Sequence, residues 1–141
     1  MPLVELTIDE TATLETEAVA TALCDLVITT LGGDPANPAT QEITRCEVTR
    51  RAIRSAGQAA PRAARVRYTM PAGSLSRVRK ARLAARTTRL VLAHQARPEC
   101  DPGYDVWVTF EETAYFAAAG QFWTPREIAR WVLSPRLIAA E

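Results

Sequence analysis

The feature that most constrains the fold is a strand-helix-strand pattern at the start of the chain. Apolar and polar residues alternate over residues 3–8, which predicts a half-buried strand. A helix with apolar residues at three-and-four spacing follows. Thr11 to Thr13 offer caps at its start, and Gly32-Gly33 ends it. A second strand is predicted over about 43–50, so these elements form one β-α-β unit.

The same order of elements returns 62 residues later. A strand pattern lies at 66–70, a helix runs from Ser74 or Ser76 to about His94, and another strand pattern follows at 106–110. The two copies share element type, length and phase, although few of their residues are identical. The sequence therefore predicts a tandem repeat.

The repeat predicts an α+β fold in a single domain over residues 1–141. Its two β-α-β units cover about 2–50 and 64–111, and a tail covers 112–141. Because β-α-β crossovers are right-handed, both helices should cover the same face of a four-stranded mixed sheet. The alternative is a ferredoxin-like module that binds a small ligand or a partner. That module interleaves its two halves, so strand order distinguishes the two folds.

The second helix has an apolar arc beside a stripe of arginines, which consists of Arg79, Arg82, Arg86 and Arg89. We expect the arc to face the sheet and the stripe to face solvent. The arc consists of Val78, Ala81, Ala84, Ala85, Thr88, Val91 and Leu92. The stripe has no interleaved aromatic residues, and the net charge is only +1, so no nucleic-acid partner is predicted.

Two segments fall outside the repeat. Residues 51–62 carry no clear period and are predicted to form a long loop. The tail is apolar and aromatic, and Thr124 with Glu127 forms a capping box for a short C-terminal helix to about Leu133. A tail this apolar indicates packing between subunits.

Composition limits the classes of function. No apolar run is long enough for a membrane helix and no leader precedes the first strand, so we expect a cytoplasmic protein without membrane contact. The three cysteines are widely spaced without a CxxC motif, and His94 is the only histidine. These counts favour a reduced compartment and predict no metal and no cofactor.

The start of the chain carries the candidate catalyst. Pro2 follows the initiator methionine and opens the first strand, so removal of Met1 would leave a secondary amine at the edge of a sheet. The competing interpretation is structural, because proline is tolerated at the first residue of a strand.

Three stretches together resemble the tautomerase superfamily. They are MPLVELTI at the start, AVATALCDLVITTLGG in the first helix and YDVWVTFEETAYFAAAGQF near the end. The branches that the chain resembles are those of cis-3-chloroacrylic acid dehalogenase and malonate semialdehyde decarboxylase. The resemblance implies a homotrimer that acts on a small keto, enol or unsaturated acid, with Pro2 as general base or acid. It also implies an isomerase or lyase, and the apolar replacements in the expected pocket favour a role in secondary metabolism.

The resemblance implies further site residues. Arg45 falls near an arginine that small tautomerases carry early in their second strand, and Arg51 offers a cation from the adjacent loop. Thr109 stands where the branch has a tyrosine, and Glu112 follows the last strand. These four are the predicted substrate-binding residues, and Pro2 is the predicted catalytic residue.

The sequence departs from that branch at four places. The branch has a histidine in the first helix where this chain has about Val27 or Ile28, and a pair of arginines where it has residues 70–74. It has a tyrosine at the position of Thr109 and an acid near the position of Ala118. Two interpretations follow. The chain is an enzyme with a different set of helper residues, or it is a catalytically silent trimer that serves as a binding or scaffold protein.

Overall fold

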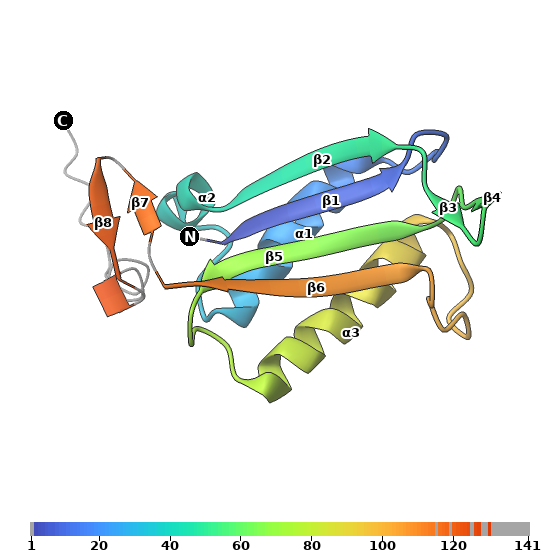
Figure 1. The fold of residues 1–141 in the computed structure, drawn as a ribbon. Helices are drawn as coiled ribbons and strands as arrows, with labels where there is room; N and C mark the ends of the chain where they lie inside the picture. The colour runs from blue at the N-terminus through green and yellow to red at the C-terminus, as the bar shows by residue number, and fades with distance from the viewer. Residues whose placement is uncertain (1, 115, 119, 125, 128–129, 131–141) are drawn as a thin grey trace.

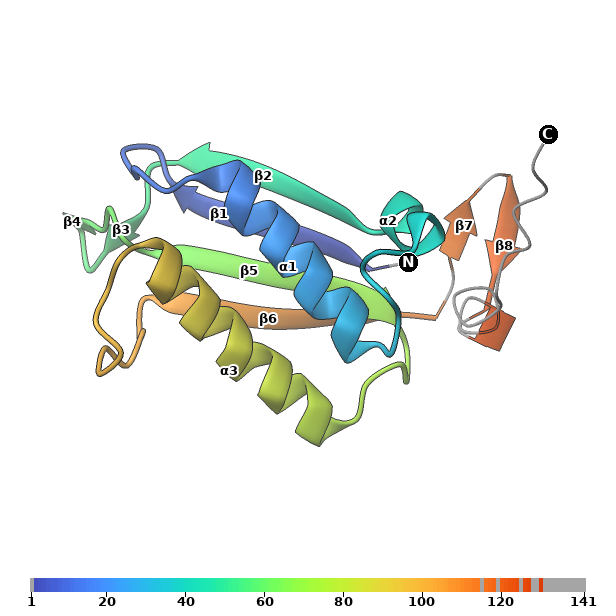
Figure 2. The ribbon, with the colours of Figure 1, turned by 180° about the vertical axis from the view of Figure 1, so that it is seen from behind.

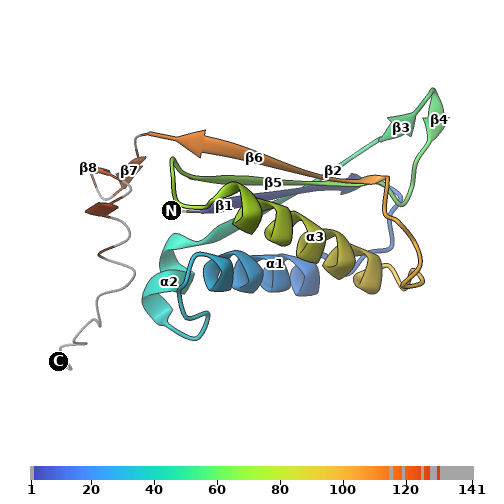
Figure 3. The same ribbon diagram turned by 90° about the horizontal axis from the view of Figure 1, so that it is seen from below.

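The computed structural model describes residues 2–114, 116–118, 120–124, 126–127 and 130. A four-stranded sheet forms one layer, and two long helices form a second layer on one of its faces (Figures 1–3). The main elements are β1 (Leu3–Asp9), α1 (Thr16–Thr30), β2 (Arg45–Arg51), β5 (Ala64–Pro71), α3 (Arg77–His94) and β6 (Val106–Thr113). The α+β prediction with both helices on one face is confirmed.

The strand order distinguishes the tandem fold from the ferredoxin-like alternative. The sheet has the order β2-β1-β5-β6. The pairs β1–β2 and β5–β6 are parallel, and β1 meets β5 in antiparallel orientation at the centre. Each predicted unit therefore contributes its own parallel pair, and the halves are not interleaved. This arrangement rules out the ferredoxin-like fold.

The register gives the repeat an approximate twofold axis. Glu5 of β1 lies opposite Arg67 of β5, and these two positions are separated by the same 62 residues as the repeat. Two side chains at equivalent positions thus face each other across the centre of the sheet. They form a salt bridge with a 2.5 Å contact on the face that the helices leave uncovered.

The core lies between the sheet and the helices. Every second residue of the central strands is fully buried there, including Leu6 and Tyr68. Tyr68 stacks on Phe110 with ring centroids 5.7 Å apart. Its hydroxyl shares a 2.6 Å hydrogen bond with Thr87 of α3, which satisfies the polar end of a buried ring. The complete set of core residues is Val4, Leu6, Ile8, Leu14, Val19, Leu23, Val27, Ala64, Val66, Tyr68, Met70, Leu75, Leu83, Val91, Leu92 and Val106.

The predicted helix details need two corrections. The threonine caps were wrong: α1 begins at Thr16 after Glu15, and Thr11 instead donates to the Asp9 carboxylate. The predicted inner face of α3 was rotated. Leu83 and Thr87 are buried, whereas Val78 is 60% exposed. The bond between Thr87 and the buried Tyr68 hydroxyl compensates for the burial of both polar groups, which simple apolar periodicity cannot anticipate.

The connecting segments hold more structure than predicted. A short helix, α2 (Pro38–Ile43), precedes β2 and is capped by the Asn37 side chain. The predicted loop after β2 contains a small hairpin of β3 (Arg54–Ser55) and β4 (Gln58–Ala59). In the tail, β7 (Phe116–Ala118) pairs with β8 (Gln121–Trp123). The predicted helix to Leu133 lies largely outside the described residues, but the capping box forms, with Glu127 accepting from Thr124.

Candidate active site

Pro2 lies at one end of the sheet, next to the first residue of β1. It is buried, and its carbonyl accepts a 3.3 Å hydrogen bond from the Arg45 backbone N–H. The N-terminus, α2 and the β7–β8 hairpin all lie at this end of the molecule (Figures 1 and 2). We refer to it as the proline end. Met1 lies outside the described residues, so its removal stays a condition of the amine chemistry.

The sheet register places two other residues in line with Pro2. Leu3 pairs with Thr69, so one further step puts Pro2 opposite Met70, and Met70 pairs with Glu112 of β6. Side chains alternate between the two faces of a strand, so Pro2, Met70 and Glu112 all point to the helix side. Met70 is fully buried and provides an apolar neighbour for Pro2.

Glu112 belongs to an ion pair at the proline end. Its Oε1 lies 2.9 Å from Nζ of Lys80 and also accepts a 3.3 Å hydrogen bond from the Gly73 N–H. Gly73 has φ +75°, which glycine adopts readily in the turn between β5 and α3. The Lys80 ammonium, followed by the Gly73 hydrogen bond, lowers the pKa of the Glu112 carboxyl. Glu112 is therefore an anion at neutral pH.

The distance from this ion pair to Pro2 follows from strand spacing. Two inter-strand steps separate β1 from β6, which corresponds to about 10 Å. Within one chain, Pro2 and the Lys80–Glu112 pair therefore lie at the same sheet end without touching, with the buried Met70 side chain between them.

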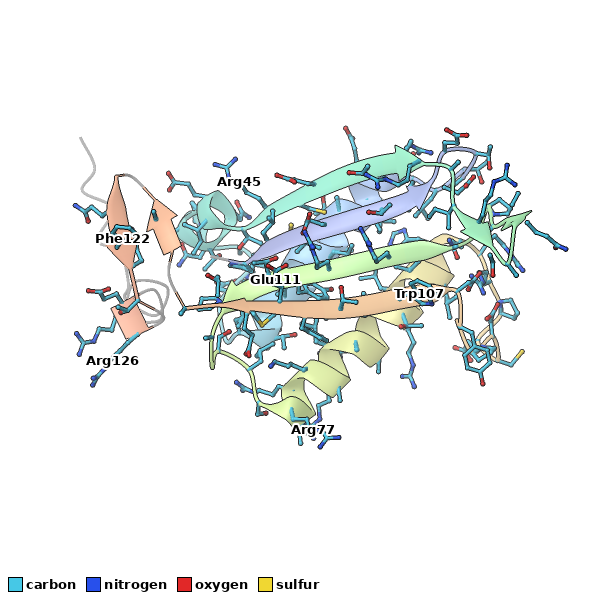
Figure 4. All side chains as sticks on the ribbon, in the orientation of Figure 1. Arg45, Arg77, Trp107, Glu111, Phe122 and Arg126 are labelled. Atoms are coloured by element: carbon cyan, nitrogen blue, oxygen red, sulfur yellow. The ribbon has the colours of Figure 1, made fainter. Side chains whose placement is uncertain are left out.

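Arg45 is at the proline end, but its side chain follows the opposite face. It is the first residue of β2, pairs with Leu3 and is exposed. Figure 4 shows Arg45 beside α2, near the start of β2. The Arg45 backbone thus contacts Pro2, and its exposed guanidinium lies at the proline end as well.

Arg51 and Thr109 are not close to Pro2 within one chain. Arg51 ends β2 opposite Asp9, six residues beyond Arg45 and so about 20 Å along the strand. Thr109 pairs with Arg67 in the middle of β6, on the uncovered face. Of the five predicted site residues, the structure brings Pro2, Arg45 and Glu112 to one end of the sheet.

The sequence reasoning missed Lys80. The signal was present, because Lys80 is the only lysine in a chain whose positive charges are otherwise arginines. It lies in the first turn of α3, where a cation is disfavoured by the helix dipole, so a local anionic partner is needed. Glu112 provides that partner from a strand that is 32 residues further along the chain.

The described residues offer no ready metal site. They contain no group of three or more His, Cys, Asp or Glu side chains that could hold a metal ion. In the same part of the chain, no helix has the length and apolar character needed to cross a membrane. The chemistry available at the proline end is that of a buried strand terminus, an apolar wall, a carboxylate–ammonium pair and the guanidinium groups of Arg45 and Arg126 (Figure 4).

Comparison with solved structures identifies the fold. The chain superimposes on N1, a member of the cis-3-chloroacrylic acid dehalogenase family, with a TM-score of 0.70 and 16% identity over 92% of this chain and 89% of that chain. For a fused 4-OT symmetric trimer, the TM-score is 0.68 and the identity 22%, over 89% of this chain and 98% of that chain. For MIF2 of Leishmania major, the TM-score is 0.65 and the identity 17%, over 87% of this chain and 97% of that chain. The chain therefore has the same fold as these dehalogenase-family, 4-OT and MIF structures, which is the fold that the resemblance implied.

The sequence itself carries little of this likeness. No protein-family model and no curated protein matches it. At these identities the structural likeness defines the fold, whereas function depends on the residues at the site.

Proposed function

We propose that this protein is an enzyme of the tautomerase type that uses the nitrogen of Pro2 to move protons on a small keto, enol or unsaturated acid. The observation that supports this proposal is the burial of Pro2 at the start of β1, in a fold shared with 4-OT and MIF proteins. The reaction is an isomerisation or a lyase step, and we assign no cofactor to it.

The amine chemistry depends on removal of Met1, which turns the Pro2 nitrogen from an amide into a secondary amine. Burial disfavours the charged form of an amine, so we expect the pKa of this group to lie below its ordinary value. A neutral amine accepts the proton from the carbon beside the substrate carbonyl and then returns it to the other end of the enol. Met70 contributes to the burial.

We assign the substrate carboxylate to the cations of the proline end. Arg45 supplies a planar fork of N–H donors that matches a carboxylate. Glu112 keeps Lys80 oriented at the same end. Arg51 and Thr109 remain proposed substrate-binding residues for a site to which a neighbouring subunit contributes, because neither approaches Pro2 in its own chain.

A homotrimer is part of this proposal. One structural neighbour is described as a fused 4-OT symmetric trimer. The uncovered face carries a network of polar and charged side chains, and Phe122 of β8 is 81% exposed at the proline end (Figure 4). Exposed aromatic residues of this kind favour subunit contacts. We propose that the protein acts in the cytoplasm and that its reaction belongs to secondary metabolism.

The decisive experiment starts with intact mass and ends with turnover. The purified protein should lack Met1 and should ketonise phenylenolpyruvate or 2-hydroxymuconate. Pro2→Ala should reduce kcat/KM by about a hundredfold or more, which is the usual contribution of a positioned general base. Arg45→Ala should mainly raise KM. Arg86→Ala, on the exposed stripe of α3, is the matched control and should change neither constant.

The alternative is a catalytically silent trimer with the same fold. It is favoured by the charges at the proline end, because Lys80 and Glu112 already neutralise each other. Retention of Met1 would exclude the amine mechanism and support this alternative. A Met-free protein whose activity toward both compounds is absent, or is unchanged by Pro2→Ala, would also support it.

A further inference from the structure

A cleft lies between the second half of α3 and the loop that joins α3 to β6. Its volume is about 840 Å³, which is within the range of small-molecule sites. The α3 wall includes Arg89 and Leu92, and the loop wall includes Pro98, Glu99 and Pro102. The cleft is at the end of the sheet opposite to the proline end, where β5 and β6 begin (Figure 1). The reaction proposed for Pro2 does not use it.

The loop wall of the cleft is held in place by the nearly buried Arg97 side chain. Its Nε and Nη2 atoms donate to the two carboxylate oxygens of Asp101 at 2.8 and 3.0 Å, and Nη2 also lies 2.8 Å from the Asp105 carboxylate. Asp101 in turn accepts a 2.8 Å hydrogen bond from the Gly103 N–H. The loop is therefore ordered by its own contacts, so a ligand that enters the cleft pays little for ordering it.

Gly103 brings this loop against α3. It has φ +65°, and a Cβ at this position would lie 2.7 Å from Cγ2 of Thr88 and 3.2 Å from Cδ1 of Leu92. A larger residue would therefore push the loop away from the helix. The Arg97 N–H also donates to the Leu92 carbonyl at 2.9 Å. These contacts fix the base of the cleft and the position of its two walls.

Two side chains of opposite charge in the cleft have no partner. Arg89 on α3 and Glu99 on the loop are both exposed. Among the residues that the structure describes, neither forms an ion pair or a side-chain hydrogen bond. The other charged residues of the lining, Arg97 and Asp101, are paired with each other. The cleft thus has an unpaired cation on one wall and an unpaired anion on the other, together with the apolar side chains named above.

We propose that this cleft binds a free amino acid with a large apolar side chain. Arg89 binds the α-carboxylate, because its planar fork of N–H donors matches two carboxylate oxygens. Glu99 accepts hydrogen bonds from the α-ammonium, and the apolar side chain of the ligand packs against Leu92 and the two prolines. A simple organic acid has no group for Glu99, and a simple amine has none for Arg89. The two charges therefore select a ligand that carries both.

Binding in this cleft requires neither the removal of Met1 nor turnover at Pro2. The inference therefore stands independently of the proposed function, and a binding measurement tests it without an activity assay.

The test is isothermal titration calorimetry of the full chain with leucine and with phenylalanine. Both should bind with a Kd on the order of 100 μM, which is typical of a small ligand in an open cleft. N-Acetylphenylalanine lacks the ammonium, and phenylalaninamide lacks the carboxylate. Each should bind about tenfold or more weakly than phenylalanine, because one charged group of the cleft is then left without a partner. Glycine, which has no apolar side chain, should also bind more weakly.

Two conservative variants assign the charges. Arg89→Gln should raise the Kd for phenylalanine about tenfold or more but leave that for phenylalaninamide unchanged, since this compound has no carboxylate. Glu99→Gln should raise the Kd for phenylalanine and leave that for N-acetylphenylalanine unchanged. Arg86→Ala is the matched control, because Arg86 lies on the same helix but does not line the cleft. It should keep the wild-type Kd.

Three results would overturn the inference. The first is no binding of leucine or phenylalanine to the wild type at concentrations up to about 10 mM. The second is equal affinity for phenylalanine and its two blocked forms, since the charges would then select nothing. The third is an unchanged Kd for phenylalanine in both Arg89→Gln and Glu99→Gln, which would place the binding elsewhere on the molecule.

Discussion

The two β-α-β units share one backbone pattern but support their outer strands differently. In the first unit, β2 is exposed along most of its length. In the second, β6 is anchored by the Tyr68–Phe110 stack and by the bond between Lys80 of α3 and Glu112. The loop before β6 is also fastened, because the nearly buried Arg97 side chain binds both Asp101 and Asp105. In the first unit, Arg50 of β2 donates to the Ala12 and Leu14 carbonyls, but the second unit has the stacked rings and the nearly buried Arg97, so we expect it to be the more stable of the two.

The beginnings of the two units differ in a way that bears on chemistry. The position equivalent to Pro2 in the second unit is Ala64, which lies inside the chain and whose N–H donates to the Asp105 carbonyl. Only the first unit can offer a terminal amine.

The largest expected effect concerns the core of the second unit. Tyr68→Ala should lower the free energy of unfolding by about 3–5 kcal/mol, because it removes a fully buried ring and leaves a cavity. It also removes the stack on Phe110 and leaves the Thr87 hydroxyl unpaired. Urea unfolding measures the loss. Tyr68→Phe, which keeps the ring, should cost about 1 kcal/mol.

The equivalent position in the first unit is Leu6, which is also fully buried. Leu6→Ala should cost about 2–4 kcal/mol, since a smaller side chain is lost without a hydrogen bond. If Leu6→Ala proved more damaging than Tyr68→Ala, the second unit would not be the stronger of the two, and the comparison would fail.

The next effect concerns the loop that leads into β6. Arg97→Ala should lower the free energy of unfolding by about 2 kcal/mol, because its side chain is only 6% exposed and makes charged hydrogen bonds. Arg89→Ala, on the exposed stripe of α3, is the control and should stay within about 0.5 kcal/mol. An equal loss in both variants would show that the Arg97 contacts contribute nothing specific.

Much of the fold was predictable because it depends on local periodicity. The alternation over residues 3–8 and 66–70 predicted β1 and β5, and the repeat spacing predicted their pairing into one sheet. The rotation of α3 was not predictable, because Thr87 is buried through a bond to Tyr68 that is 19 residues away. The β7–β8 hairpin was missed, because three-residue strands carry too little pattern to separate from an apolar tail.

The candidate site was less predictable than the fold. Pro2 was found from its position in the chain, and the sheet register then brought Arg45 and Glu112 to the same end. Lys80 was missed, because its role depends on the packing of α3 against β6. The distance of Arg51 and Thr109 from Pro2 depends on where each residue lies along its strand, which the family resemblance did not specify.

Acid should weaken the contribution of one aspartate to stability in each unit. Thr11 and the Ile53 N–H lower the pKa of Asp9 in the first unit, and Arg97 and the Gly103 N–H lower that of Asp101 in the second. A carboxyl with a lowered folded-state pKa stabilises the fold above its unfolded pKa, which is about 4 for aspartate. That contribution is lost as the pH falls through the folded-state pKa.

Asp9→Asn should therefore lower the Tm above about pH 5, and its difference from the wild type should shrink as the pH falls below about 4. Asp101→Asn should behave in the same way. Thermal melts across this pH range measure both differences. If either difference grew toward low pH, the sign of the corresponding pKa shift would be wrong.

The smallest effect tests the approximate twofold axis itself. Glu5→Arg alone places two cations opposite each other on neighbouring strands, and Arg67→Glu alone places two anions there. Each should lower the Tm by a few degrees at low salt, because the pair is partly exposed.

The double variant Glu5→Arg with Arg67→Glu restores opposite charges and should recover most of the loss. The charges around the pair also change: Glu111, which lies 3.5 Å from Arg67, would then face an anion, whereas Glu47, which pairs in register with position 5, would gain a cation. The prediction fails if the Tm of the double variant is no higher than that of the single variants. It also fails if the recovery of Tm does not depend on salt, because an ion pair between the two units would then not be its cause.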